Sequence, residues 1–364
     1  MSSRSFLPCL PSILGSMAKP SRVQIWVVGC GLLAVALPFF VGAVLSFVAR
    51  HQPWSIPKSM GYVSPAETPG RGLWVRYLGV SGYEISDGAT TLILDPGLTR
   101  PRVVELLTGP IDPDPDLSAR LTPKADFVLV NHAHYDHILD APEILRRTDA
   151  TMVGSRSTGN LALARGLPPA QVRVVEPGDR VTLGSFLVEV GHAEHSPAYG
   201  FASLAAGVIP PDAGPLWMWE YAADASYSYR ISGGGASILF HVSSQFVAER
   251  VSAVPVGTVF LGVAGKKLSE ATARDVMSRC RPQRVFPTHY DNFFQPVDAG
   301  LALLPGLDLD AVAAIFRKVA PEARFGVLDY GERIYLPPDR DEAEPVAGES
   351  TDAGSPPTPP DSPP

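Results

Sequence analysis

Short apolar runs and longer periodic segments alternate along most of this chain. Short runs rich in β-branched residues predict buried strands, and segments with apolar residues at helical spacing predict helices. The expected strands cover residues 74–78, 83–85, 90–94, 126–130, 151–154, 172–175, 180–190, 227–231, 237–242, 258–263 and 283–287, and the expected helices cover 138–147, 157–165, 269–279 and 307–319. This alternation predicts an α/β domain whose first three strands form an antiparallel meander.

Three other stretches have less regular patterns. Residues 98–125 are rich in proline and aspartate and predict a loop that rims a site, whereas 325–335 predicts a terminal hairpin that turns at Tyr330. Residues 216–221 are large and apolar or aromatic except for Glu220. They fit the wall of a pocket, a contact with a membrane, or a strand with a buried aromatic face.

The N-terminal region contains a long uncharged segment. No charged residue occurs from Ile25 to Val48, and these twenty-four residues, as a helix with a rise of about 1.5 Å per residue, would span a ~30 Å hydrocarbon core. They predict a transmembrane helix, although a cleaved signal peptide is an alternative. Lys19 and Arg22 flank the segment on one side, and Arg50 and Lys58 flank it on the other. With Arg4 and the amino terminus added, the charge bias predicts a single-pass membrane protein with its main domain on the non-cytoplasmic side.

Composition divides the whole chain into five segments. A tail (1–22) and the anchor (23–50) come before a Pro- and Gly-containing linker (51–72), a globular domain (73–336) and a disordered, Pro-rich acidic tail (337–364). The net charge is -7, and 18% of residues are charged. No clustered basic face is evident, so nucleic acid is not expected as a partner. Of three cysteines only Cys280 lies in the globular part, which argues against an internal disulfide.

The strongest chemical signal follows the strand at 126–130. His132, His134, Asp136 and His137 come within six residues, on a loop between a strand and a helix. In extended backbone His132 and His134 project from the same face, and Asp136 and His137 follow on the turn. Imidazoles and a carboxylate bind zinc or a related divalent metal. The alternative, a polar surface loop, would not require four donors in this context.

The pattern His-x-His-x-Asp-His at 132–137 resembles the signature of the metallo-β-lactamase superfamily. The opening meander, which ends at Asp95-Pro96, resembles the L-ascorbate-6-phosphate lactonase-like and N-acyl-phosphatidylethanolamine phospholipase D-like branch. The resemblance implies a four-layer αββα sandwich and hydrolytic activity. It also implies that His195, in Ala193-Glu194-His195-Ser196, completes a three-histidine site with His132 and His134. His289, after the strand at 284–287, would join Asp136 and His137 in a second, weaker site.

Other positions are assigned by the same resemblance or left open. The family phrase His-x-Gly-Asp, which supplies an aspartate that bridges two metals, corresponds to residues 241–244, and there Ser244 replaces the aspartate. His192 and His241 could support the site or be ordinary residues. Asp95 either orients a metal-bound histidine or ends its strand, and Asp291 either contacts a ligand or substrate or lies in a turn.

The residues themselves predict a metal-binding domain, and the family resemblance implies that it is a metal-dependent hydrolase. One tightly bound zinc is expected, with a second site in doubt and other divalent metals possible. Zinc would activate a hydroxide, which Asp136 would orient or deprotonate, to attack an ester, lactone or phosphodiester bond in a small-molecule or lipid substrate. The alternative is a non-catalytic metal-binding or scaffold protein that keeps the fold, as the loss of the bridging aspartate at Ser244 would suggest.

Overall fold

The computed structural model describes residues 39–40, 42–43, 46, 53–195, 206–243, 245–265 and 267–340. The chain divides into two compact units, Met1–Phe47 and Val48–Pro364. Every strand and helix named below belongs to the second unit.

Two seven-stranded sheets form the centre of this unit. The first sheet contains, in spatial order, β14 (Arg333–Leu336), β1 (Leu73–Gly79), β2 (Gly82–Ser86), β3 (Thr91–Leu94), β4 (Phe127–Leu129), β5 (Thr151–Gly154) and β6 (Val172–Val174). The second contains β13 (Arg324–Phe325), β12 (Arg284–Thr288), β11 (Thr258–Gly262), β10 (Ala236–His241), β9 (Tyr227–Gly233), β8 (Phe186–His192) and β7 (Arg180–Leu183). Both sheets mix parallel and antiparallel pairs.

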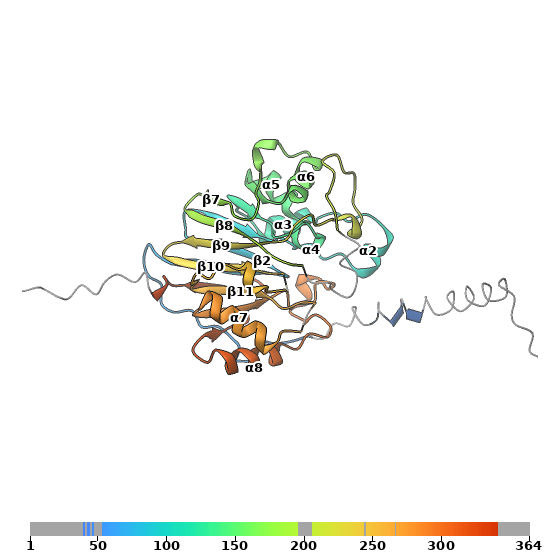
Figure 1. Cartoon of the computed structure of the whole chain (residues 1–364). Helices are drawn as coiled ribbons and strands as arrows, with labels where there is room; N and C mark the ends of the chain where they lie inside the picture. Colours follow the sequence, from blue (N-terminus) through green and yellow to red (C-terminus); the bar gives the residue numbers. More distant parts are fainter. Residues whose placement is uncertain are drawn as a thin grey trace, which may run out of the picture. The chain divides into compact units, whose positions relative to one another are not determined.

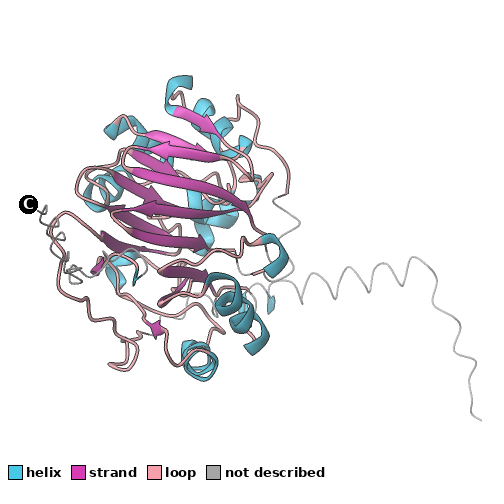
Figure 2. Ribbon diagram, turned by 60° about the vertical axis from the view of Figure 1, so that its left-hand side comes forward, coloured by secondary structure: helices cyan, strands magenta, loops and turns pink. Residues whose placement is uncertain are grey.

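Helices cover the outer faces of the two sheets. They are α2 (Val103–Thr108), α3 (Pro115–Leu121), α4 (Tyr135–Ile138), α5 (Ala141–Thr148), α6 (Arg156–Ala164), α7 (Glu270–Cys280) and α8 (Leu309–Val319). Figure 1 shows α3 to α6 on one side of the strands and α7 and α8 on the other, and Figure 2 shows strands at the centre with helices around them. The predicted αββα sandwich is therefore confirmed.

Two apolar clusters account for this layering. One fills the space between the sheets and continues under α7 and α8, with Tyr83 against Phe260 (ring centroids 4.4 Å apart) and Phe260 stacked on Phe286 (5.2 Å). The other joins the first sheet to its helices through residues such as Val128 and Ile144. Strands buried on both faces read as continuous apolar runs, which explains the patterns at 126–130 and 258–263.

The structure corrects three predicted elements. The stretch at 98–125 contains α2 and α3 rather than only a loop, since Asp114 caps α3 by accepting hydrogen bonds from the amides of Asp116 and Leu117. The residues at 325–335 form no hairpin, because β13 pairs with β12 and β14 pairs with β1 in the other sheet. Residues 216–221 form no strand but a short 3-10 turn, Met218–Glu220.

The predicted membrane location is also corrected. Within the part of the chain that the structure describes, no helix is long and apolar enough to cross a membrane. The predicted span from Ile25 to Val48 lies almost wholly outside the described residues.

Candidate metal centre

Three histidines from the two sheets converge at one end of the sandwich. His132 and His134 lie on the loop between β4 and α4, and His195 lies just beyond the end of β8. One ligand nitrogen from each lies within 4.8 Å of the other two. The His195 ring centroid is 4.7 Å from that of His132 and 4.6 Å from that of His134. The structure thus brings together the three residues predicted to form the first metal site.

Asn131 fixes the orientation and tautomer of His132. The Nδ1–H of His132 donates to Oδ1 of Asn131 at 2.7 Å, since a carbonyl oxygen can only accept. The lone pair of Nε2 is then directed towards His134, whose Nδ1 is 3.1 Å away. Ser226 donates to the same Asn131 oxygen at 3.2 Å, and the hydroxyls of Ser226 and Ser243 are 2.6 Å apart.

A second group combines Asp136, His137 and His289. Its ligand atoms also lie within 4.8 Å of one another. Oδ2 of Asp136 is 3.1 Å from Nε2 of His289 and 3.5 Å from Nε2 of His137. Asp136 and His137 belong to α4, next to the first sheet, whereas His289 directly follows β12 of the second sheet. The rings of His132 and His137, with centroids 4.0 Å apart, place the two groups side by side.

Asp95 supports this second group at the end of β3. Its Oδ2 accepts a hydrogen bond from Nδ1 of His137 at 2.8 Å, and its Oδ1 accepts one from the amide of Asn131 at 2.6 Å. The Asp95 carboxylate is fully buried. The structure places the Asp95 carboxylate against His137, the arrangement that the first of its two predicted roles requires. This bond leaves Nε2 of His137 free to face Asp136.

The turn between β1 and β2 holds His289. The amide of His289 donates to the carbonyl of Val80 at 2.7 Å, and the hydroxyl of Thr288 donates to the same oxygen at 3.1 Å. Val80 (φ 56°) and His289 (φ 59°) both have left-handed backbone conformations. Such conformations are uncommon for a β-branched residue and persist when surrounding contacts hold them.

Burial and neighbouring charges set the protonation of the centre. Burial, with the nearby His137 and His134, lowers the pKa of His132 well below its ordinary value. For Asp136, burial raises the pKa, but the charges of His137 and His289 and a hydrogen bond from His289 outweigh it, and the net pKa is lowered. For His137, burial lowers the pKa, but Asp136 and Asp95 outweigh it and the net pKa is raised.

The donor set fits a divalent metal. His132 is neutral with its lone pair directed inward, and Asp136 carries a negative charge between two imidazoles. Imidazole nitrogens held by outer hydrogen bonds to a carboxylate or carboxamide are typical of bound zinc and related ions. A polar loop without a metal would not require these six donor side chains to be held so close together.

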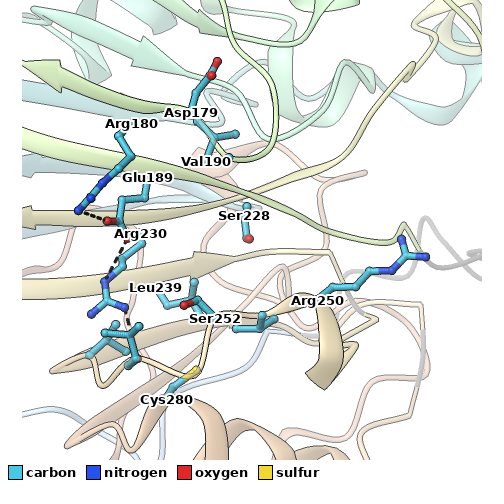
Figure 3. A pocket seen from close by; sticks show the side chains of 15 residues that line it. Asp179, Arg180, Glu189, Val190, Ser228, Arg230, Leu239, Arg250, Ser252 and Cys280 are labelled. Atoms are coloured by element: carbon cyan, nitrogen blue, oxygen red, sulfur yellow. Dashed lines mark hydrogen bonds and ion pairs between the residues drawn. The ribbon is translucent and has the colours of Figure 1, made fainter.

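His192 lies away from both groups. It is exposed at the end of β8, with its ring 3.2 Å from the Arg250 guanidinium. Arg250 lines a groove of about 260 Å³ on the second sheet, in which Glu189 pairs with Arg180 at 2.6 Å and with Arg230 at 3.7 Å (Figure 3). The choice of His195 over His192 therefore agrees with the observed positions.

The remaining predicted positions have other surroundings. His241 is buried, contacts Phe246 and donates from Nε2 to the Gln245 carbonyl at 3.2 Å, so it takes no part in either group. Ser244 lies outside the described residues. Asp291 is fully buried and accepts hydrogen bonds from Tyr77, Val80, Arg100 and Tyr330, not from any histidine of the centre.

Several supporting residues were missed by sequence reasoning. Asn131 stands directly after the β4 run and before the first ligand, a position that could have suggested an orienting role. Ser226 and Ser243 carry no local signal, because they meet Asn131 only through the packing of the two sheets.

Comparison with known proteins gives concordant matches. A family model described as a beta-lactamase superfamily domain matches residues 74–289. A UPF0173 metal-dependent hydrolase of Anaeromyxobacter dehalogenans is 26% identical over 222 residues, 58% of this chain and 72% of that relative. One of Cupriavidus necator is 25% identical over 292 residues, 78% of this chain and 95% of the relative. Among solved structures, a metallo hydrolase of Ignicoccus hospitalis is 20% identical and covers 72% of this chain and 98% of its own, with a TM-score of 0.46.

The family match spans well over half of the chain and contains both metal groups. It begins in β1 and ends at His289, so it includes every residue of the two groups. The names of the relatives agree with the prediction of a metal-dependent hydrolase. The predicted family is confirmed, and this chain belongs to the metallo-β-lactamase superfamily.

Proposed function

We propose that this protein is a zinc-dependent hydrolase that cleaves an ester, lactone or phosphodiester bond in a small-molecule or lipid substrate. The observation that carries the proposal is the pair of adjacent donor groups, His132–His134–His195 and Asp136–His137–His289. Three histidines leave one position open in a four-coordinate zinc site, the arrangement of catalytic rather than structural zinc. When bound, zinc acts as a Lewis acid and lowers the pKa of the water that it binds.

The residues of the chain would position the reactants. Asn131 and Asp95 hold the rings of His132 and His137, so that the donor atoms need little rearrangement. Asp136 keeps its negative charge because its pKa is lowered, which suits it to orient a water molecule by accepting a hydrogen bond. A carboxylate of low pKa is a weak base, so orientation is its larger proposed contribution.

The decisive experiment combines metal analysis with activity. We expect the purified protein to contain zinc and to hydrolyse at least one of aryl esters, lactones and aryl phosphodiesters. His134→Ala should remove both metal and turnover. Asp136→Asn should keep zinc at the three-histidine group and reduce the rate by at least ~100-fold, as expected for loss of a group that acts on the attacking water. His192→Ala, which changes an exposed histidine outside the centre, is the matched control and should leave both unchanged.

A non-catalytic scaffold is the competing function. The replacement of the usual bridging aspartate by Ser244 favours it. A wild-type protein that is loaded with zinc yet inert on all three substrate classes would support the scaffold and contradict the proposed hydrolase.

A further inference from the structure

A largely apolar pocket lies at the carboxyl end of β11. Its volume is about 330 Å³, within the ~300–1,000 Å³ range of small-molecule sites. The loop after β11 forms one wall, and the segment before α8 together with the first turns of α8 forms the other. Its aliphatic lining includes Val263, Leu268, Leu304, Leu307, Val312 and Ile315, and Lys267 and Asp308 are its charged members.

The pocket is built onto the turn that carries His289. β11 and β12 are parallel neighbours with Gly262 opposite Thr288, and the next residues along the two strands are Val263 and His289. The amide of Val263 donates to the carbonyl of Thr288 at 3.1 Å. On the other wall, the amide of Leu304 donates to the carbonyl of Tyr290 at 2.8 Å. The residues before and after His289 are therefore each hydrogen-bonded to one wall of the pocket.

The lining is suited to an aliphatic group. Val263 and Leu304 are buried in the core, but Leu268, Leu307 and Ile315 are only partly buried and keep apolar surface in contact with water. Covering such surface is favourable in proportion to the apolar area removed from water. Near the metal centre, and outside the lining of the pocket, the half-buried Phe293 packs edge-on against His289 with ring centroids 5.2 Å apart.

The hollow on the other side of Asp291 has a different character. It is about 380 Å³, and its lining combines the charged residues Arg100, Asp114, Asp116, Arg120 and Asp298 with Thr99 and the apolar residues Leu98, Leu117, Pro296 and Val297. Charged side chains of this kind would have to be desolvated by an alkyl chain, which is unfavourable. The pocket after β11 is the less charged of the two hollows, because two charged residues, Lys267 and Asp308, line it, whereas five line the other.

We infer that the pocket between the β11 loop and α8 binds the aliphatic acyl or alkyl chain of the substrate. The inference rests on the proposed hydrolase, whose metal centre would hold the bond to be cleaved while the chain extends past His289. It narrows the substrate class to esters, lactones or phosphodiesters that carry an unbranched chain of several carbons.

Binding of n-alkanols tests the pocket without turnover. We expect calorimetric titration of the full-length protein to show affinity that rises from butanol to octanol by about three- to fourfold per methylene, the transfer free energy of a buried CH₂. Ala311→Trp, at a half-buried alanine of α8 that lines the pocket, should weaken octanol binding by at least ~10-fold. Ala314→Trp, at an exposed alanine of the same helix, is the matched control and should bind like the wild type.

A second variant covers the case in which Ala311→Trp does not fold. Ile315→Ala removes a lining side chain and should shift the tightest binding to a longer alkanol. Affinity that does not depend on chain length, or that Ala311→Trp and Ile315→Ala both leave unchanged, would overturn the inference.

Hydrolysis of aryl alkanoates, from acetate to decanoate, separates this inference from the proposed function. We expect kcat/KM to rise with chain length, and Ala311→Trp to lower it for decanoate while acetate stays within about twofold. Turnover without any dependence on chain length would overturn the pocket and leave the hydrolase standing. Chain-length-dependent alkanol binding by a protein inert on every substrate would support the pocket and contradict the hydrolase.

Discussion

The guanidinium of Arg100 lies 2.8 Å from the carboxylate of Asp291, and both side chains are almost fully buried, at 2% and 0% exposure. Asp291 also accepts hydrogen bonds from the amide of Val80 at 2.9 Å and from the hydroxyl of Tyr330 at 2.8 Å. Since the carbonyl of Val80 accepts a hydrogen bond from the amide of His289, Val80 connects this ion pair to a predicted ligand of the metal centre. It also joins the loop after β3 to the turn after β12.

Asp291→Asn should therefore destabilise the fold. Removing one partner of a buried ion pair typically costs 3–5 kcal/mol because the other charge remains buried and uncompensated. For a domain of this size that corresponds to a fall in Tm of roughly 10 °C, measurable by calorimetry. Asp298→Asn is the matched control, because its pair with Arg120 is exposed (72% and 55%) and should contribute less than about 1 kcal/mol. Equal effects of the two variants would contradict this account of Asp291.

Asp95→Asn should weaken metal binding selectively. An amide in place of the carboxylate removes the charge that faces the Nδ1–H of His137, and loss of such a partner typically lowers metal affinity 10–100-fold. The three-histidine group should be less affected, since the ring of His132 is hydrogen-bonded to the side chain of Asn131 and not to Asp95. Stepwise titration of the metal-free protein with cobalt, followed by absorbance, would separate the two steps. A uniform loss in both steps would show that Asp95 acts on the whole loop.

Stability should fall in acid because of His241. Burial lowers the pKa of His241 to about 4, whereas an unfolded histidine has a pKa of about 6.5. Between these values the unfolded state binds more protons, so the contribution of His241 is complete above pH ~6.5 and is lost as the pH falls towards ~4. The loss is on the order of 3 kcal/mol.

Urea unfolding of the wild type and His241→Gln at several pH values measures this contribution. The variant should be less stable at neutral pH, yet it should show a smaller decline between pH 7 and pH 4. Parallel declines in the two proteins would assign the acid sensitivity to other groups.

Ser244→Asp should raise the affinity for a second metal. Two cations a few ångströms apart repel each other, and a carboxylate between them offsets that repulsion where a hydroxyl does not. We expect the wild type to hold fewer than two metals tightly, with the three-histidine group filled first, and the variant to approach two by elemental analysis after dialysis. Ser244→Asn, which has the shape of aspartate without its charge, is the matched control and should bind metal like the wild type. Two equally tight metals in the wild type would refute this prediction.

Local sequence predicted the donors better than the groups that support them. Histidines that follow apolar runs, such as His132 and His289, could be predicted as donors because strand ends in an α/β sandwich meet at one edge. The contacts of Asp291 with Tyr77, Arg100 and Tyr330 span up to 214 positions in the chain, and no local pattern encodes such pairs. The same limit explains the misassigned hairpin, since the chain between β13 and β14 passes from one sheet to the other.

The donors of each metal group come from both sheets: His195 joins two residues of the β4 loop, and His289 joins two residues of α4. A bound ion would thus link the two sheets, because residues from both would coordinate it. Because an ion held in this way binds the docked sandwich and not its separated halves, metal should raise the free energy of unfolding by an amount that grows with the logarithm of metal concentration. Separation of the two sheets and release of metal should then be one cooperative event, and the metal-free protein should reveal how firmly the two sheets adhere without it.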